Sequence, residues 1–202
     1  MKKMDYKFDH SDEAYQEAQR KIKWVEDKDR NALDLSGLGL TDLPPEIGSL
    51  VGLERLNLAE NKLSGLPEGI SMLVNLRELN LRQNLITSLL PEIGSLTALR
   101  TLILSSNKLA DLPSEISTLL DLRELYLTDN NLEKLPAVVG QLRNLEGLYL
   151  SYNRLESLPI ELTQLDKLEI LYLEGNPNLG LSDKVVAKAL SPEEILTAYF
   201  DL

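Results

Sequence analysis

Leucine and other apolar residues recur along this 202-residue chain at a fixed interval, with polar residues at fixed places between them. Three leucine series, which begin at Leu53, Leu56 and Leu58, repeat every 23 residues. An asparagine keeps the same interval, at Asn61, Asn84, Asn107, Asn130, Asn153 and Asn176. The unit reads LxxLxLxxNxL, as in LRELYLTDNNL over residues 122–132. Such a period indicates a solenoid of stacked units.

The first half of each unit predicts a strand and the second half a short helix. In LxL, alternate side chains face one side because strand side chains have a period of two. The asparagine follows, where its amide can donate and accept hydrogen bonds at a backbone bend. The second half reads LPxxIxxL, which suits a helical or 3-10 turn with Pro at its first position. Leu90 replaces this Pro in one unit, and we expect a small local shift there.

Stacking decides the overall shape. One unit cannot bury its own apolar face, whereas stacked units share a continuous core. Neighbouring strands lie about 4.8 Å apart, and the turns on the other side are bulkier, so the stack must curve. The sequence therefore predicts an α/β solenoid, a horseshoe with a parallel sheet on its concave face, short helical or 3-10 turns on its convex face, and helical caps at both ends.

The N-terminal part of the chain differs from the repeats. We expect a flexible arm over residues 1–10 and a capping helix over residues 11–30. Ser11 is the expected N-cap, and an apolar face carries Ala14, Ala18, Ile22 and Val25. A helix that binds a partner is the alternative to a cap. The repeats follow over residues 31–177 and begin with a half unit, in which Leu38 occupies the asparagine position.

The C-terminal part, residues 178–202, is expected to form a second helical cap. The register fails after Asn176, and the segment Ser191-Pro192-Glu193-Glu194 carries the N-cap, the proline and the glutamate of a helix start. Ile195, Leu196, Tyr199 and Phe200 supply its apolar face.

The units resemble the leucine-rich repeats of the 23-residue LPxxIxxLxxLxxLxLxxNxL type, over about residues 33–177. Such repeats occur in Ras-associated scaffold proteins, plant intracellular Ras-group repeat proteins and many bacterial repeat proteins. The resemblance implies a protein-interaction module or scaffold, with a small GTPase or another signalling protein as a candidate partner by analogy. The alternative that it implies is the recognition domain of a larger enzyme, either a multidomain GTPase or a secreted bacterial effector.

Composition narrows the class of partner. The formal net charge of −11 disfavours nucleic acid and anionic membranes, which attract basic surfaces. Solubility explains such a charge, and a basic partner is the alternative. The chain has no Cys, no apolar run of membrane-spanning length and no signal-peptide pattern, so we expect a cytoplasmic, monomeric protein.

Catalytic patterns are missing from the sequence, and we expect no enzyme activity, metal or cofactor. The only histidine, His10, lies in the expected arm, and no His/Cys/Asp/Glu cluster has metal-ligand spacing. A row of glutamates falls in the convex turns, where we expect a solvated face: Glu46, Glu92, Glu115 and Glu161, with Glu68 one place out of register. A row of arginines before the strands (Arg77, Arg100, Arg123) is expected to pair with neighbouring acids.

The predicted concave face offers a candidate binding site. Residues between the core leucines point out of the sheet, and in the C-terminal half they form a tyrosine ladder with an apolar extension. Exposed tyrosines are enriched at interface hot spots. The candidate contacts are Arg55, Asn57, Asn80, Arg82, Ile103, Tyr126, Thr128, Tyr149, Tyr152 and Tyr172. Two alternatives stay open: the ladder only stabilises the sheet, or the chain is an acidic structural spacer.

Overall fold

The computed structural model describes residues 13–181 and 190–201. Seven strands form one parallel sheet in chain order, and each residue pairs with the residue 23 positions later, as Leu33 does with Leu56. Each strand starts one residue before the LxL segment and has three residues. The strands are β1 Ala32–Asp34, β2 Arg55–Asn57, β3 Glu78–Asn80, β4 Thr101–Ile103, β5 Glu124–Tyr126, β6 Gly147–Tyr149 and β7 Ile170–Tyr172.

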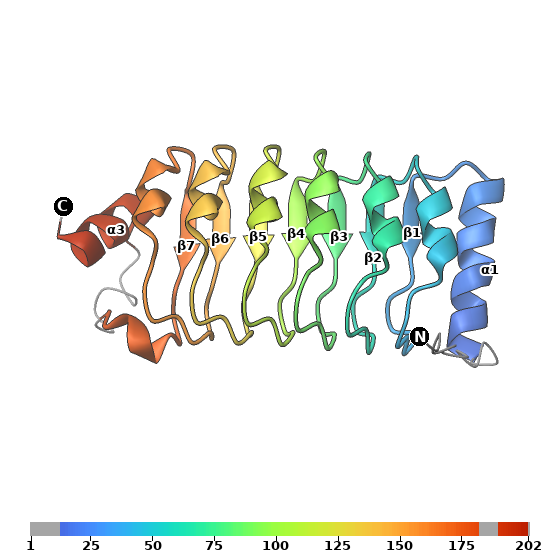
Figure 1. Ribbon diagram of the computed structural model, residues 1–202, viewed down its shortest axis with the longest axis horizontal. Coiled ribbons are helices and arrows are strands. Elements are labelled where there is room, and N and C mark those ends of the chain that lie inside the picture. The colour runs from blue at the N-terminus through green and yellow to red at the C-terminus, as the bar shows by residue number, and fades with distance from the viewer. Residues whose placement is uncertain (1–12, 182–189, 202) are drawn as a thin grey trace, which may run out of the picture.

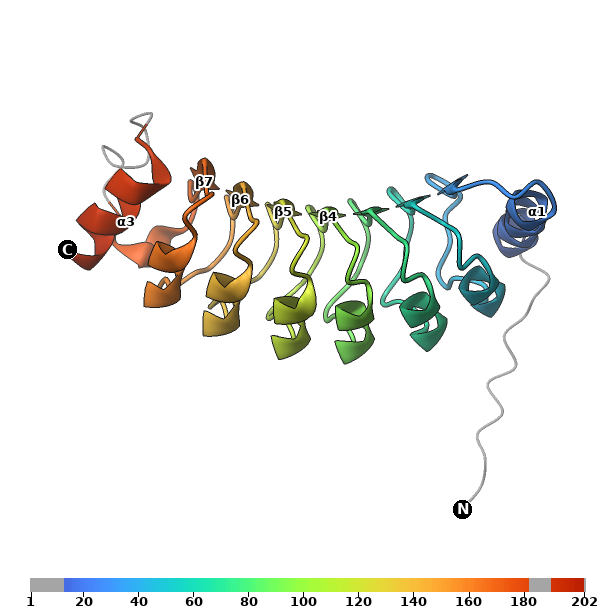
Figure 2. The ribbon, with the colours of Figure 1, turned by 90° about the horizontal axis from the view of Figure 1, so that it is seen from above.

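The chain curves into a shallow arc with the strands on its inner side and short helices on its outer side (Figure 1, Figure 2). The predicted solenoid with a concave parallel sheet is therefore confirmed. The inward leucines form one continuous core, and Leu79, Leu102 and Leu125 are fully buried. No single unit could bury these side chains alone, so stability comes from contacts between neighbours.

The convex turns are 3-10 helices, as expected. They are η1 Pro45–Ser49, η2 Glu68–Met72, η3 Pro91–Ser95, η4 Ser114–Thr118, η5 Ala137–Gln141 and η6 Ile160–Gln164. A further short 3-10 helix, η7 Pro177–Leu179, directly follows the last asparagine of the repeats and is not one of these convex turns. The predicted place of the proline was wrong in most units, because Pro67, Pro113, Pro136 and Pro159 lie one residue before the helix.

The shift expected at Leu90 was also wrong. Leu90 has φ −73° and ψ 152°, and Pro67 has φ −71° and ψ 153° at the same position. The leucine reaches the backbone conformation that proline imposes elsewhere, and Pro91 follows it as the first helical residue. A proline at position 90 is therefore not required, because Pro91 favours the extended conformation of the residue before it.

Buried asparagines connect successive units by hydrogen bonds. In Asn107, Oδ1 accepts from the Ile86 amide at 3.0 Å, and Nδ2 donates to the carbonyls of Leu81 and Leu104 at 2.9 and 3.0 Å. Two of these three partners belong to the preceding unit. Leu38 has no preceding unit to bond, which explains why an apolar residue is tolerated at that position.

Helices close both ends of the stack (Figure 1). Helix α1, Glu13–Asp27, buries Ala18, Ile22 and Val25 against the first unit. The expected arm, its histidine and the N-cap Ser11 lie outside the described residues. None of the described helices is long and apolar enough to cross a membrane.

Helix α3, Pro192–Phe200, packs on η6 at the other end. Its start is the predicted capping box: the Ser191 hydroxyl accepts from the Glu194 amide at 3.2 Å, and the Ser191 amide donates to Glu194 Oε2 at 2.8 Å. Ile195 and Leu196 are buried. The Leu158 amide donates to the Tyr199 hydroxyl at 3.2 Å, which links the helix to the backbone of the repeats.

Candidate protein-binding surface

Three tyrosines lie side by side on the last three strands of the concave face. The strand register places Tyr126 beside Tyr149 and Tyr149 beside Tyr172. The rings of Tyr126 and Tyr149 are stacked, with centroids 4.1 Å apart and planes at 6°. Tyr172 meets Tyr149 edge to face, at 5.5 Å and 76°. The tyrosine ladder predicted from the sequence is therefore present, although whether it binds a partner stays a prediction.

Exposure increases toward the end of the ladder. Tyr126 and Tyr149 are half-buried because each ring is covered by its neighbours, whereas Tyr172 keeps 57% of its surface exposed. Burial raises the pKa of the Tyr149 hydroxyl, and the Tyr126 side chain and the charge of Glu124 raise it further. Tyr149 is therefore a neutral phenol at physiological pH.

Ile103 and Thr128 extend this surface toward the middle of the sheet. Ile103 pairs with Tyr126 in the register, and both Ile103 and Thr128 are half-buried. Tyr152 lies one turn beyond β6, where its backbone has φ +57°. Its side chain is 56% exposed, and its hydroxyl donates to Glu174 Oε1 at 3.4 Å. The concave face thus carries an aromatic and apolar surface over β4–β7, which we call the tyrosine surface.

The sequence did not indicate the role of Glu124 and Gly147 in this surface. Glu124 lies on β5, and its Oε2 is buried without a hydrogen-bond partner among the described residues. Gly147 occupies the neighbouring position on β6. A Cβ at residue 147 would come within 3.0 Å of the Glu124 carboxyl carbon and within 2.8 Å of the Tyr149 ring. The glycine therefore provides the space that the Glu124 side chain occupies.

The N-terminal half of the concave face is polar, as predicted, but its asparagines also bond their own backbone. Asn57 Oδ1 accepts from the Ala59 amide at 3.2 Å, and Asn80 Oδ1 accepts from the Arg82 amide at 3.0 Å. Asp34 does the same with Ser36, whose hydroxyl and amide hydrogen bonds lower the pKa of Asp34. These side chains stabilise the strand exits.

The two arginines of the candidate site are exposed on this half. Arg55 is on β2, and Arg82 follows β3 two residues after Asn80. Within the described ranges, neither forms an ion pair. Together with the exposed carboxylates of Asp34 and Glu78, they make the N-terminal half of the concave face a surface of mixed charge, whereas the tyrosine surface has no basic residue.

The charged rows behave as surface features. The glutamates lie in the first turns of the convex 3-10 helices. Arg77 pairs with Glu54 at 3.5 Å and Arg123 with Glu146 at 3.1 Å. In the part of the chain that the structure describes, no three His, Cys, Asp or Glu residues could hold a metal ion.

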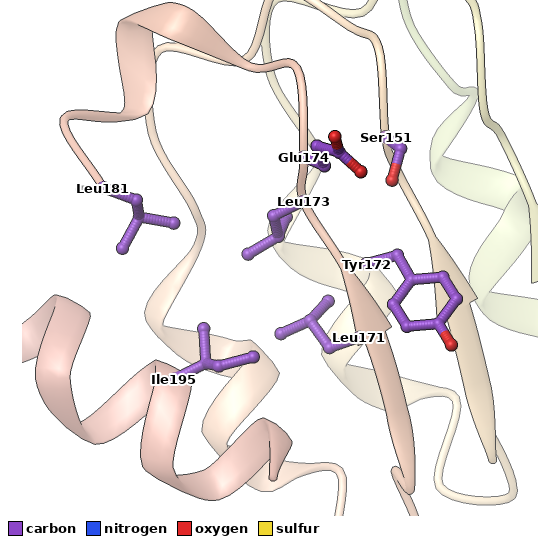
Figure 3. A pocket seen from close by; sticks show the side chains of 7 residues that line it. All are labelled: Ser151, Leu171, Tyr172, Leu173, Glu174, Leu181 and Ile195. Atoms are coloured by element: carbon purple, nitrogen blue, oxygen red, sulfur yellow. The ribbon is translucent and has the colours of Figure 1, made fainter. Parts of the chain in front are cut away.

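A small cavity adjoins the tyrosine surface at its C-terminal end. It has a volume of about 190 Å³ and lies between β7 and helix α3. Leu171, Leu173 and Ile195 line its apolar side, while Tyr172 lies on the other side of the strand (Figure 3). The concave face is thus continuous with the junction between the last repeat and the helix.

Comparisons with known proteins agree with this architecture. The family described as leucine rich repeat matches residues 31–86, 52–109, 74–132 and 121–177. No curated protein matches the chain. Among solved structures, a leucine-rich-repeat protein of Leptospira interrogans is 42% identical with a TM-score of 0.67, and the alignment covers 68% of this chain and 35% of that one.

Two plant receptors are also similar. One is the leucine-rich-repeat ectodomain of the membrane receptor kinase GASSHO1/SCHENGEN3 from Arabidopsis thaliana, in complex with CASPARIAN STRIP INTEGRITY FACTOR 2 (30% identity, TM-score 0.69, 77% of this chain and 19% of that one). The other is the plant peptide hormone receptor RGFR1 in complex with RGF2 (31% identity, TM-score 0.60, 77% and 30%).

The alignments thus span about a third or less of these three chains. The family match extends from residue 31 to residue 177 and accounts for every strand of the sheet. This protein belongs to the leucine-rich-repeat family, whose fold is a protein–protein interaction module.

Proposed function

We propose that this chain is a non-enzymatic binding module whose concave face holds a protein partner, with the tyrosine surface as the main contact. A cytoplasmic signalling protein, such as a small GTPase, is the partner class that the resemblance of the repeats suggests. The two plant receptors, each solved with a bound partner, support a binding role for this fold.

The exposed end of the tyrosine ladder is the observation that carries the proposal. Tyr172 and Tyr152 keep more than half of their surface exposed, at 57% and 56%. A ladder that served only the sheet would gain stability by covering these rings. Large, rigid side chains with a polar tip contribute strongly when a partner covers them. Ordering the Tyr172 ring on binding also costs little conformational entropy, because its edge-to-face contact with Tyr149 already holds it in place.

The experiment is an affinity capture from native lysate with three forms of the chain. The test variant is Tyr126→Ala/Tyr149→Ala/Tyr172→Ala, and a milder variant, Tyr172→Ala, removes only the exposed ring at the end of the ladder. The control is Leu120→Ala, which removes an apolar side chain that is 58% exposed outside the concave sheet. Circular dichroism confirms that each variant is folded.

A protein that the wild type and Leu120→Ala capture, and that both tyrosine variants lose, supports the proposal. Equal capture by all folded forms rejects the concave site and favours the structural-spacer alternative or a convex contact. Loss by Leu120→Ala alone would place the contact outside the sheet.

A recognition region of a longer protein is the second candidate. The matched chains are about three to five times longer than the parts that align, and one belongs to a receptor kinase. The binding surface would be the same in that case. Sequencing the complete reading frame at the gene's locus tests this candidate: an enzyme domain in the same frame supports it, and a frame that encodes the repeats alone rejects it.

A further inference from the structure

We propose that the tyrosine surface recognises a basic side chain of the partner, an arginine or a lysine, which binds between the Glu124 carboxylate and the neighbouring tyrosine rings. This inference rests on the proposed function and adds the chemistry of the partner. Charge distribution, the state of Glu124 and the geometry of the rings support it independently.

Charge differs between the two halves of the concave face. The outward positions of β4–β7, together with the outward residue that follows each strand, contain two carboxylates, Glu124 and Glu174, and no Lys or Arg. The corresponding positions of β1–β3 contain two basic residues, Arg55 and Arg82, and two acidic residues, Asp34 and Glu78, so their charges balance. A basic group is therefore attracted more strongly to the tyrosine surface than to the N-terminal half, which would fix the orientation of the partner.

The Glu124 carboxylate hydrogen-bonds the Tyr149 side chain, but one of its oxygens lacks a donor. Its Oε2 is buried, and none of the described residues hydrogen-bonds it. A buried acceptor without a donor is unfavourable, and the cost is larger for a charged group. An ammonium or guanidinium group that approaches the half-buried Glu124 side chain places the opposite charge beside this carboxylate and offsets part of the cost. Glu78, at the same place on β3, is exposed and has solvent to satisfy it.

The surroundings of Glu124 suit a cation with a long side chain. Gly147 beside it presents no side chain, and the Glu124 carboxylate and the edge of the Tyr149 ring lie over this glycine. The Tyr126 ring is stacked on that of Tyr149. A guanidinium group can bond a carboxylate through two N–H groups and also lie against an aromatic ring. Glu174, at 3.4 Å from the Tyr152 hydroxyl, offers a second carboxylate farther along the same face.

The test is an NMR titration of the ¹⁵N-labelled chain with the blocked tripeptide acetyl-Gly-Arg-Gly-amide. Binding is monitored by the chemical shifts of the backbone amides. We expect saturable shifts at the amides of β5 and β6 and none at those of β1 and β2. Acetyl-Gly-Glu-Gly-amide is the matched probe and should produce no saturable shift. Raising the salt from about 0.01 M to about 0.1 M shortens the screening length from about 30 to about 10 Å and should weaken the binding.

Two variants separate a specific site from general attraction to an acidic protein. Glu124→Gln and Glu78→Gln remove the same charge from the same column of the sheet and keep the size of the side chain. We expect Glu124→Gln to raise the dissociation constant of the arginine probe about tenfold or more. Glu78→Gln should change it by less than about twofold, because exposed charges contribute little.

Several results would overturn the inference. They are shifts spread over the whole chain, no saturable shift at β5 and β6, or equal weakening by the two variants. Its failure is distinguishable from failure of the proposed function. If a captured partner depends on the tyrosines but binds Glu124→Gln as well as wild type, the concave site stands and the basic anchor is wrong. If capture does not depend on the tyrosines, the proposed function itself fails.

Discussion

The buried asparagines allow a quantitative prediction about the stability of the solenoid. Replacing Asn107 with Leu keeps the approximate size of the side chain but removes its hydrogen bonds. The Ile86 amide, at 3.0 Å, loses its partner, whereas the carbonyls of Leu81 and Leu104 lose one donor each but keep those of Asn84 and Asn130. Each group left without a partner costs about 1–3 kcal/mol. One group is left without a partner and two carbonyls are weakened, and the greater apolarity of leucine offsets part of this, so we expect a loss of about 1–3 kcal/mol in the free energy of unfolding.

Asn75→Leu is the matched control. Asn75 is exposed, and its Nδ2 donates to the Val51 carbonyl at 2.9 Å. Solvent can replace this partner, so the loss should stay below about 1 kcal/mol. The assay is urea unfolding monitored by far-ultraviolet circular dichroism. The dependence of the free energy of unfolding on urea concentration should be the same for wild type and both variants, so that their stabilities can be compared.

The shape of the unfolding curve also depends on the position of the substitution within the repeats. Stability of a solenoid is roughly a sum of units and nearest-neighbour interfaces. A break at Asn107 can therefore split one transition into two, with the halves unfolding separately. A loss for Asn107→Leu no larger than that for Asn75→Leu would refute the hydrogen-bond explanation of the asparagine ladder.

Three further predictions concern backbone space, backbone strain and pH. A Cβ at Gly140 would come within 2.5 Å of Glu161 in the next turn, so Gly140→Ala should lower the free energy of unfolding by about 1–3 kcal/mol. Gly52→Ala is the control, because a Cβ there meets nothing within 4 Å. Equal urea midpoints for the two variants would contradict the prediction. Gln83 is exposed with φ +54°, and Gln83→Gly should raise the melting temperature through a gain of up to about 1 kcal/mol; a lower melting temperature would count against strain. The folded-state pKa of Tyr149 is raised, so the unfolded chain deprotonates first and stability falls as pH rises above about 10. Tyr149→Phe should therefore lose less stability than wild type between about pH 8 and pH 11 in urea unfolding, and an equal loss would show that burial does not protect this hydroxyl.

The fold could be predicted from the sequence because each unit contains the same local signals. Leu56 and its equivalents specify the inward side of a strand, and the asparagine marks the bend that follows. If the pattern of one unit had been misinterpreted, the same pattern in the other units would have corrected the prediction. The shift expected at Leu90 was wrong because Pro91, the next residue, favours the same extended backbone that proline imposes in the other units.

The candidate site could be predicted only in part. The period of two placed Tyr126, Tyr149 and Tyr172 in one column, but it did not give their ring angles. Glu124 was not singled out, because the burial of its Oε2 depends on the space above Gly147 in the next unit. Side-chain conformations and the neighbours across strands decide such features, and they have no local signature.

The asparagine hydrogen bonds also limit how the chain can change its length. Asn107 bonds backbone groups 21 and 26 positions earlier, and the strands pair residues 23 positions apart. Each unit therefore offers its successor the same set of partners that it takes from its predecessor. Loss or duplication of a whole unit in the interior restores all of these offsets, whereas loss of any other small number of residues breaks them. Gene rearrangements that respect the 23-residue period can thus lengthen or shorten the concave face without a new fold having to arise.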